Sequence, residues 1–272
     1  MSLTFYDIAL APPAEKSSCS PNPWKSRYAL NFKRVPYKTT WVPLPDISAV
    51  RAPLNIPPSR RFADGSAYFT LPVITDPITE TTVGDSFEIA VYLNEQYPTS
   101  GGDLFPPQDL NFVFGCKLDL FAPIAVADVG EEGHIPAYVR FNTNVDGAFT
   151  AHAQLMAGYL PLDPARADET KTTFEKRIGL PWDAMIVHGE TRVELLQSLE
   201  ETLKGLVDLY RRDASGPFLL GAKASYADFI VGGWLRMCRG ALPPAEWELI
   251  KGWYDGLFGN LHEALEEYAQ MN

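Results

Sequence analysis

Ser20 and Asn22 stand where an apolar, strand-like run gives way to a helical pattern. Segment 20–25, SPNPWK, is typical of a helix N-terminus, because proline is tolerated in the first helical turn. The unpaired N–H groups and positive dipole end of such a start can hold an anion, including a thiolate. Ser and Asn are also ordinary N-caps, and the local sequence does not exclude that purely structural role.

Asp85 and Ser86 precede a second helical pattern at 87–97. Asp85 with Glu88 three residues later resembles a capping box, which would be purely structural. As a site, Ser86 and the first N–H groups of the helix could hold a carboxylate, while Asp85 could accept hydrogen bonds from an ammonium. A small zwitterion would satisfy both groups.

Leu71 and Pro72 lie in segment 69–75, which has strand character. Pro72 cannot donate to a strand ladder, so it marks either an edge strand or a special turn. If the Leu71–Pro72 bond is cis, the N–H and C=O of Leu71 are left to pair with an extended peptide. A trans proline at a plain edge strand is the alternative.

The elements that would position these residues follow from the hydrophobic patterns. We expect strands at 3–8, 37–42, 69–75 and 81–83, and helices from about 21 to 35 and from 87 to 97. Strand, helix and strand in that order indicate a βαβ unit with a parallel pair. Five prolines between residues 43 and 66 leave room only for a short helix near 47–51.

The segment 98–102, PTSGG, is the clearest linker in the chain, and no convincing strand follows it. The expected features beyond it are an apolar stretch at 112–127, broken helix at 137–160, an exposed excursion at 163–176, a surface helix at 191–210, a buried helix after a capping box at 225–228 and a last helix at 261–268. We therefore predict two domains, an α/β domain and an all-helical domain.

The charge distribution excludes several classes of partner. Residues 1–98 carry nine Lys and Arg and nine Asp and Glu, so the whole net charge of -11 falls in residues 99–272. This balance argues against nucleic acid or an anionic membrane. Asp7 interrupts the apolar N-terminal run, which argues against a signal peptide, and no apolar run has membrane-spanning length.

Three cysteines, with no CxxC pair and no clustered histidines, predict a reduced, cytoplasmic protein without structural disulfides or a metal site. Cys116 and Cys238 have apolar neighbours and are expected in the core. The role of Cys19, next to Ser20, is left open.

Segments 71–74, 85–90 and 221–228, in this order and spacing, resemble the cytosolic glutathione transferases over nearly the whole chain. Within that family, segment 20–25 with Tyr37-Lys38-Thr39 and Pro45-Asp46-Ile47 looks like the fungal class A enzymes related to bacterial lignin β-etherases. The resemblance implies a thioredoxin-like domain at 1–98, a linker at 99–110 and an all-helical domain at 111–272 that lines a hydrophobic substrate site. It also implies a homodimer.

The same resemblance implies the roles of the residues singled out above. The turn of Leu71 and Pro72 would pair with the cysteinyl backbone of glutathione, and Asp85 with Ser86 would hold its γ-glutamyl end. Ser20 would occupy the catalytic Ser or Cys position, with Asn22 as a second donor and no metal. The basic residue for the glycine carboxylate is not evident, and Arg51, Arg60 and Arg61 remain unranked candidates.

The leading hypothesis is therefore a detoxifying glutathione transferase that activates the glutathione thiolate for attack on small hydrophobic, aromatic electrophiles. Ser20 cannot form a mixed disulfide, which disfavours a reductase. The alternatives are a non-catalytic carrier of hydrophobic small molecules on the same fold and a regulatory relative that has lost turnover.

Overall fold

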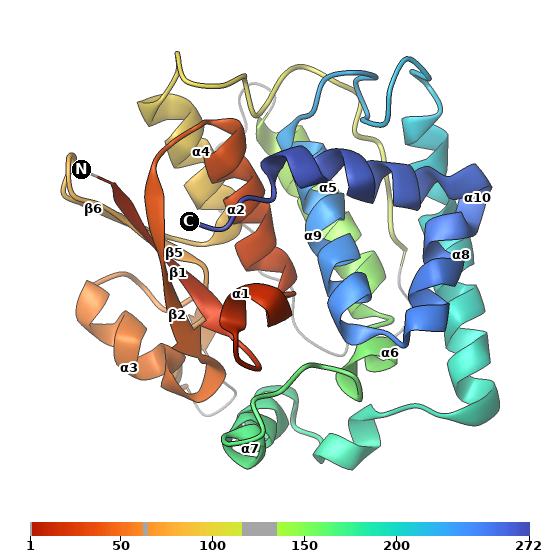
Figure 1. Ribbon diagram of the computed structural model, residues 1–272, viewed down its shortest axis with the longest axis horizontal. Coiled ribbons are helices and arrows are strands. Elements are labelled where there is room, and N and C mark those ends of the chain that lie inside the picture. The colour runs from red at the N-terminus through yellow and green to blue at the C-terminus, as the bar shows by residue number, and fades with distance from the viewer. Residues whose placement is uncertain (1, 62–64, 116–134) are drawn as a thin grey trace.

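The computed structural model describes residues 2–61, 65–115 and 135–272, with the side chain of Arg60 left out. The first part of the chain forms a mixed sheet in the order β2-β1-β5-β6 (Figure 1). Its strands are β1 (Leu3–Ala9), β2 (Tyr37–Pro43), β5 (Val73–Asp76) and β6 (Thr81–Gly84). β1 pairs with β2 in parallel and with β5 in antiparallel orientation, so the predicted parallel pair is confirmed.

The helices of this first domain lie beside the sheet. They are α1 (Ala14–Ser17), α2 (Pro21–Phe32), α3 (Ile47–Arg51) and α4 (Ser86–Gln96), with the 3-10 turns η1 (Leu44–Asp46) and η2 (Ala52–Leu54) and a short pair of strands, β3 (Arg60–Arg61) and β4 (Ala67–Tyr68). The short helix predicted at 47–51 is thus confirmed. Figure 1 shows α2 between the sheet and the helices of the second part.

The strand predicted at 69–75 begins only at Val73. β5 lies between β1 and β6 in the interior of the sheet, so the interpretation of Pro72 as an edge-strand residue is wrong. Pro72 instead belongs to a turn that precedes β5, where its missing N–H removes no ladder hydrogen bond.

The second part is helical, as predicted. It comprises α5 (Ile135–Thr150), α6 (Gln154–Ala157), α7 (Ala167–Ile178), η3 (Trp182–Met185), α8 (Gly189–Tyr210), α9 (Tyr226–Ala241), α10 (Pro244–Ala264), which is kinked at 253–256, and η4 (Leu265–Tyr268). Most of the apolar stretch at 112–127, with Cys116, lies outside the described residues. The chain thus combines a thioredoxin-like α/β domain with an all-helical domain. The boundaries at residues 98 and 110 stay a prediction.

Helix α9 holds the two domains together. The capping box predicted at Ser225 and Asp228 is present at its start, and most of its side chains are buried, including Cys238. A Cβ placed on Gly233 would lie 2.6 Å from the Pro21 carbonyl oxygen, so glycine is required for the close approach of α9 to the first turn of α2. This contact fixes the N-terminus of α2 against the helical domain.

The excursion predicted at 163–176 has little core, as expected, since Thr170 is the one buried residue of α7, but most of it is helical rather than irregular. Residues 167–178 form α7, which packs against η1 of the first domain. The Arg166 guanidinium forms a two-pronged contact with the Asp46 carboxylate, with Nη2 2.9 Å from Oδ1. Figure 1 shows α7 apart from the other long helices, on the side of the molecule that carries α3.

None of the helices among the described residues is both long enough and apolar enough to cross a membrane. Across the same residues, no group of three or more His, Cys, Asp and Glu side chains is placed to hold a metal ion.

Candidate functional site

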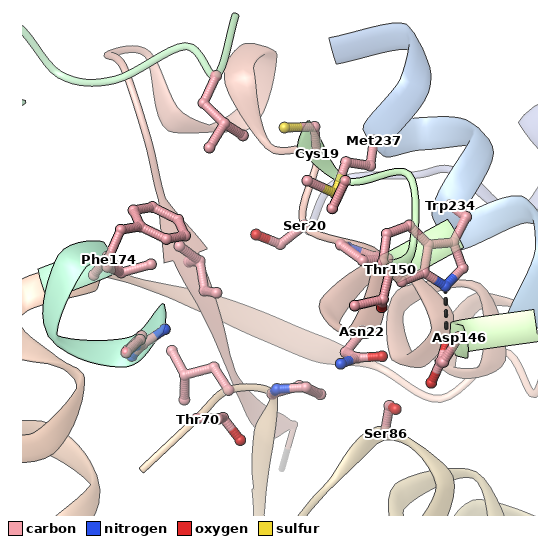
Figure 2. A pocket seen from close by; sticks show the side chains of 18 of the residues that line it. Cys19, Ser20, Asn22, Thr70, Ser86, Asp146, Thr150, Phe174, Trp234 and Met237 are labelled. Carbon is pink, nitrogen blue, oxygen red and sulfur yellow. Dashed lines mark hydrogen bonds between the residues drawn. The ribbon is translucent and has the colours of Figure 1, made fainter. Parts of the chain in front are cut away.

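A cavity of about 280 Å³ lies between the first domain and the helical domain (Figure 2). The structure brings to its wall the six residues to which the sequence analysis gave a catalytic or glutathione-binding role: Ser20, Asn22, Leu71, Pro72, Asp85 and Ser86. These residues come from three separate segments of the first domain, and the fold gathers them at one place.

Ser20 is the N-cap residue of α2 by position, with Pro21 in the first turn. Its side chain makes no capping hydrogen bond, so the purely structural role of an N-cap does not account for this hydroxyl. Figure 2 shows Ser20 projecting into the open space between Phe174 and Thr150. Asn22, two residues later in the first turn of α2, is exposed and lines the same cavity.

Cys19 also touches the cavity but is only 2% exposed. Its side chain packs against α9, where a Cβ on Gly240 would lie 3.2 Å from Sγ. Burial, followed by repulsion from the Asp7 carboxylate, raises the pKa of Cys19 to about 12. The thiol therefore stays protonated at neutral pH, which disfavours Cys19 as the reactive group.

The Leu71–Pro72 peptide bond is cis, so the trans alternative is wrong. Leu71 is buried beside the cavity and lies outside β5. The Pro72 carbonyl oxygen accepts a hydrogen bond from the Asp85 N–H at 3.4 Å. The turn before β5 and the turn before α4 are therefore in direct contact.

Asp85 caps α4 by accepting a hydrogen bond from the Phe87 N–H at 2.8 Å. Its backbone φ of 115° lies in a region that only glycine enters without strain, and such strain is often held at functional sites. Burial raises the pKa of Asp85, although Phe87 and the Lys25 ammonium oppose that shift. Ser86 is buried at the start of the helix, and its carbonyl oxygen accepts from the Tyr226 hydroxyl of α9 at 2.8 Å.

Sequence reasoning missed a charged network in the cavity wall. The buried Lys25 ammonium donates to Asp146 Oδ1 at 2.6 Å and to Asn142 Oδ1 at 2.9 Å. The Trp234 indole N–H donates to the same Asp146 oxygen at 2.7 Å. Asn142 and Asp146 are four residues apart on the buried side of α5, and two polar residues at helical spacing in an apolar stretch were the signal available in the sequence.

Most of the rest of the cavity wall is apolar and comes largely from the helical domain. Its apolar members are Ile8, Leu10, Leu44, Ala153, Ala157, Leu160, Phe174, Ile178, Trp182, Met185 and Met237. Two of them, Phe174 and Ile178, belong to α7, and the sequence placed most of this helix in an exposed excursion at 163–176. The arrangement can hold a polar ligand at one end and a small hydrophobic molecule at the other.

The arginines proposed for a carboxylate do not line this cavity among the described side chains. Arg51 is buried and donates to Ser59 Oγ at 2.8 Å and to the Pro57 carbonyl oxygen at 3.1 Å. Arg61 is exposed and donates to the Gly65 carbonyl oxygen at 3.0 Å. The side chain of Arg60 is outside the described atoms.

Comparison with known families gives two matches along the chain. Residues 19–96 match the family described as glutathione S-transferase, N-terminal domain. Residues 141–268 match the family described as glutathione S-transferase, C-terminal domain. Together the two matches take in most of the chain, and they follow the division into an α/β and a helical part.

Individual relatives agree with these matches. The glutathione S-transferase-like protein ustS of Aspergillus flavus is 28% identical over 246 residues, which are 84% of this chain and 77% of that protein. A glutathione S-transferase of Ceriporiopsis subvermispora, solved in complex with glutathione, is 28% identical with a TM-score of 0.76 and covers 100% of this chain and 99% of its own. A glutathione transferase of Phanerochaete chrysosporium is 26% identical with a TM-score of 0.77 and covers 100% of both chains.

Proposed function

The chain belongs to the glutathione S-transferase family, and we propose that its cavity binds glutathione with the thiol at Ser20 and a hydrophobic electrophile at the apolar end. The observation that carries this proposal is the cavity itself, which joins a serine hydroxyl that makes no capping hydrogen bond, the turn with Asp85 and Ser86, and a largely apolar wall. As a glutathione transferase, the protein uses glutathione as a co-substrate.

In the proposed reaction the nucleophile is the sulfur of glutathione. A thiol with a pKa near 8.5 is only a few per cent ionised at neutral pH, so a donor that favours the thiolate raises the reactive fraction. The Ser20 hydroxyl donates a hydrogen bond to the thiolate after the thiol proton has passed to solvent, and Asn22 supplies a second donor. The sulfur then forms a bond to the electrophilic carbon, and the leaving group departs with the electron pair of the bond that breaks.

The γ-glutamyl end of glutathione carries both an ammonium and a carboxylate. In the proposed complex, the hydroxyl and the N–H of Ser86, at the N-terminus of α4, hold the carboxylate. Asp85 accepts from the ammonium, whereas the carboxylate of Asp146 on the same side is already paired with the Lys25 ammonium. Leu71 pairs through its backbone with the cysteinyl unit, as in strand addition, beside Pro72.

We expect Asp85→Gly to weaken glutathione binding by about tenfold or more without damaging the fold. The variant loses a charge-assisted hydrogen bond to the ligand. Glycine accepts the φ of 115° without strain and is a tolerable N-cap, so the melting temperature should not fall appreciably. Calorimetric titration with glutathione measures the affinity, and Ser86→Ala should show a comparable loss.

The matched control is Glu95→Ala, which removes the same charge from an exposed position of α4. It should bind glutathione as the wild type does. Unchanged dissociation constants in Asp85→Gly and Ser86→Ala would refute the proposed γ-glutamyl site.

Several finer features belong to the same proposal. Likeness to fungal enzymes along the full chain supports a relation to the fungal class A enzymes, and the apolar wall with Phe174 and Trp182 supports aromatic electrophiles and a role in detoxification. A homodimer and a cytoplasmic location are proposed from the family resemblance. Sedimentation at micromolar protein concentration tests the dimer.

A carrier of hydrophobic small molecules is the second candidate, because the apolar wall of the cavity would serve it equally well. Steady-state turnover of chlorodinitrobenzene with glutathione separates the enzyme from the carrier. If the protein shows no turnover and hydrophobic small molecules displace a bound fluorescent apolar dye, the carrier is favoured instead.

A further inference from the structure

Glutathione carries a second carboxylate on its glycine, at the end opposite to the γ-glutamyl group. We infer that Arg177 of α7, in the helical domain, binds this carboxylate. The inference rests on the proposed glutathione site and names a residue that none of the sequence patterns indicated.

Arg177 lines the cavity together with Thr70 and Ser59. Its guanidinium carbon lies 5.0 Å from the centre of the Tyr68 ring, and its Nη2 lies 3.4 Å from the Phe69 carbonyl oxygen. Tyr68, Phe69 and Thr70 lead directly into Leu71. These contacts place the guanidinium beside the residues that immediately precede Leu71 in the sequence.

The γ-glutamyl site lies on the other side of Leu71, because the Asp85 N–H bonds to the carbonyl oxygen of the next residue, Pro72. Figure 2 shows the same arrangement of the two ends. Ser86 and Asp146 lie on one side of the cavity, and Thr70 and Phe174 of α7 lie on the other. An extended peptide advances about 3.3 Å per residue. A tripeptide paired with Leu71 and anchored at Asp85 must therefore direct its glycine toward Thr70 and α7.

The charges of the wall agree with this direction. Among the described residues that line the cavity, Arg177 is the one basic side chain, and the acidic ones are Asp85 and Asp146 at the γ-glutamyl end, where Asp146 is paired with the Lys25 ammonium. Arg51 does not line the cavity itself but an adjoining hollow that shares Ser59 and Asp85 with it, and its guanidinium donates to Ser59 and to the Pro57 carbonyl oxygen. A guanidinium matches a carboxylate through its planar fork of donors, so arginine suits this role.

The position of α7 gives this contact a structural basis. The Arg166–Asp46 ion pair ties the start of α7 to the first domain, and Phe174 packs on Trp182 with ring centres 5.6 Å apart. Arg177 therefore projects from a helix that is anchored at both domains. In this arrangement one helix has two roles. Arg177 binds the glycine carboxylate, and Phe174 lines the pocket for the electrophile.

The test compares glutathione with its glycine monoethyl ester, in which the glycine carboxylate is blocked. Binding is measured by calorimetry or by quenching of Trp182 and Trp234, which line the cavity. The wild type should bind the ester about tenfold or more weakly than glutathione, the loss expected for one charge-assisted hydrogen bond. Arg177→Ala should bind glutathione as weakly as the wild type binds the ester and should no longer distinguish the two ligands.

Arg177→Lys should distinguish glutathione from the ester better than Arg177→Ala does, because lysine keeps the positive charge. It should distinguish them less well than the wild type, because lysine lacks the planar pair of donors of the guanidinium. Lys176→Ala is the matched control, because Lys176 is an exposed cation on the same helix, and it should discriminate as the wild type does. If Arg177→Ala is destabilised, Arg177→Gln keeps most of the packing and must give the same loss of discrimination.

Full discrimination in folded Arg177→Ala or Arg177→Gln would overturn the inference. Loss of discrimination in Arg61→Ala or Arg60→Ala, with Arg177→Ala unaffected, would do the same and identify the responsible residue. An altered KM for the electrophile alone would also overturn it. A wild type that binds neither ligand would instead overturn the proposed function.

Discussion

Ser20→Ala is expected to lower kcat for conjugation by about 100- to 1,000-fold. This is the effect of removing one hydrogen-bond donor to a negative charge that the site must stabilise, here the glutathione thiolate. The hydroxyl lies in a cavity with a largely apolar wall, where water replaces the lost donor poorly. Asn22 should sustain the residual rate. Steady-state kinetics with chlorodinitrobenzene measures the loss, and glutathione binding by calorimetry shows that the site is otherwise intact.

Cys19→Ala is the matched comparison at the neighbouring position. Cys19 is buried with a pKa raised to about 12, so its loss should change conjugation little. Conjugation that is retained in Ser20→Ala and lost in Cys19→Ala would contradict the assignment. Glutathione-dependent thiol transfer in the wild type would contradict it as well.

Asp228→Ala is expected to lower the free energy of unfolding by about 3 kcal/mol or more, because it leaves several buried donors without an acceptor. The carboxylate is fully buried and accepts from the Leu219 N–H at 2.9 Å and from the N–H and hydroxyl of Ser225 at 2.8 and 3.0 Å. Burial raises the pKa of Asp228 to about 6. Urea unfolding measures the change.

Asp208→Ala provides the control, because Asp208 is exposed on α8 and its removal should change the unfolding free energy by no more than about 0.5 kcal/mol. Equal stabilities of the two variants would show that the Asp228 network is not what fixes α9. A loss of turnover without a loss of stability in Asp228→Ala would contradict the structural role assigned to it.

The features that the sequence predicted are local ones. The capping box before α9 depends on residues within one helical turn, and the parallel pair of β1 and β2 depends on a strand, a helix and a strand that follow one another along the chain. The residues proposed for glutathione could be singled out for the same reason, because Ser20 and Asp85 stand immediately before helices. Their meeting in one cavity was implied only by the family resemblance.

The features that were missed depend on contacts between distant segments. Lys25 and Asp146 are 121 residues apart. Lys25 ends the segment 20–25 that the sequence singled out, but nothing in that segment indicated a partner on α5. Helix α7 has few apolar residues because it closes a cavity rather than filling a core, so its composition is that of an exposed segment. Arg177 could not be chosen before α7 was placed against Phe69.

The central claim is that this protein lowers the thiol pKa of bound glutathione through Ser20. The direct measurement is a pH titration of the ultraviolet absorbance of the thiolate, with glutathione saturated by wild-type protein and by Ser20→Ala. The account predicts a thiol pKa in the wild-type complex clearly below the value near 8.5 of an ordinary thiol, and a return toward that value in Ser20→Ala. An unshifted pKa in the wild-type complex, or the same lowered pKa in both complexes, would contradict it.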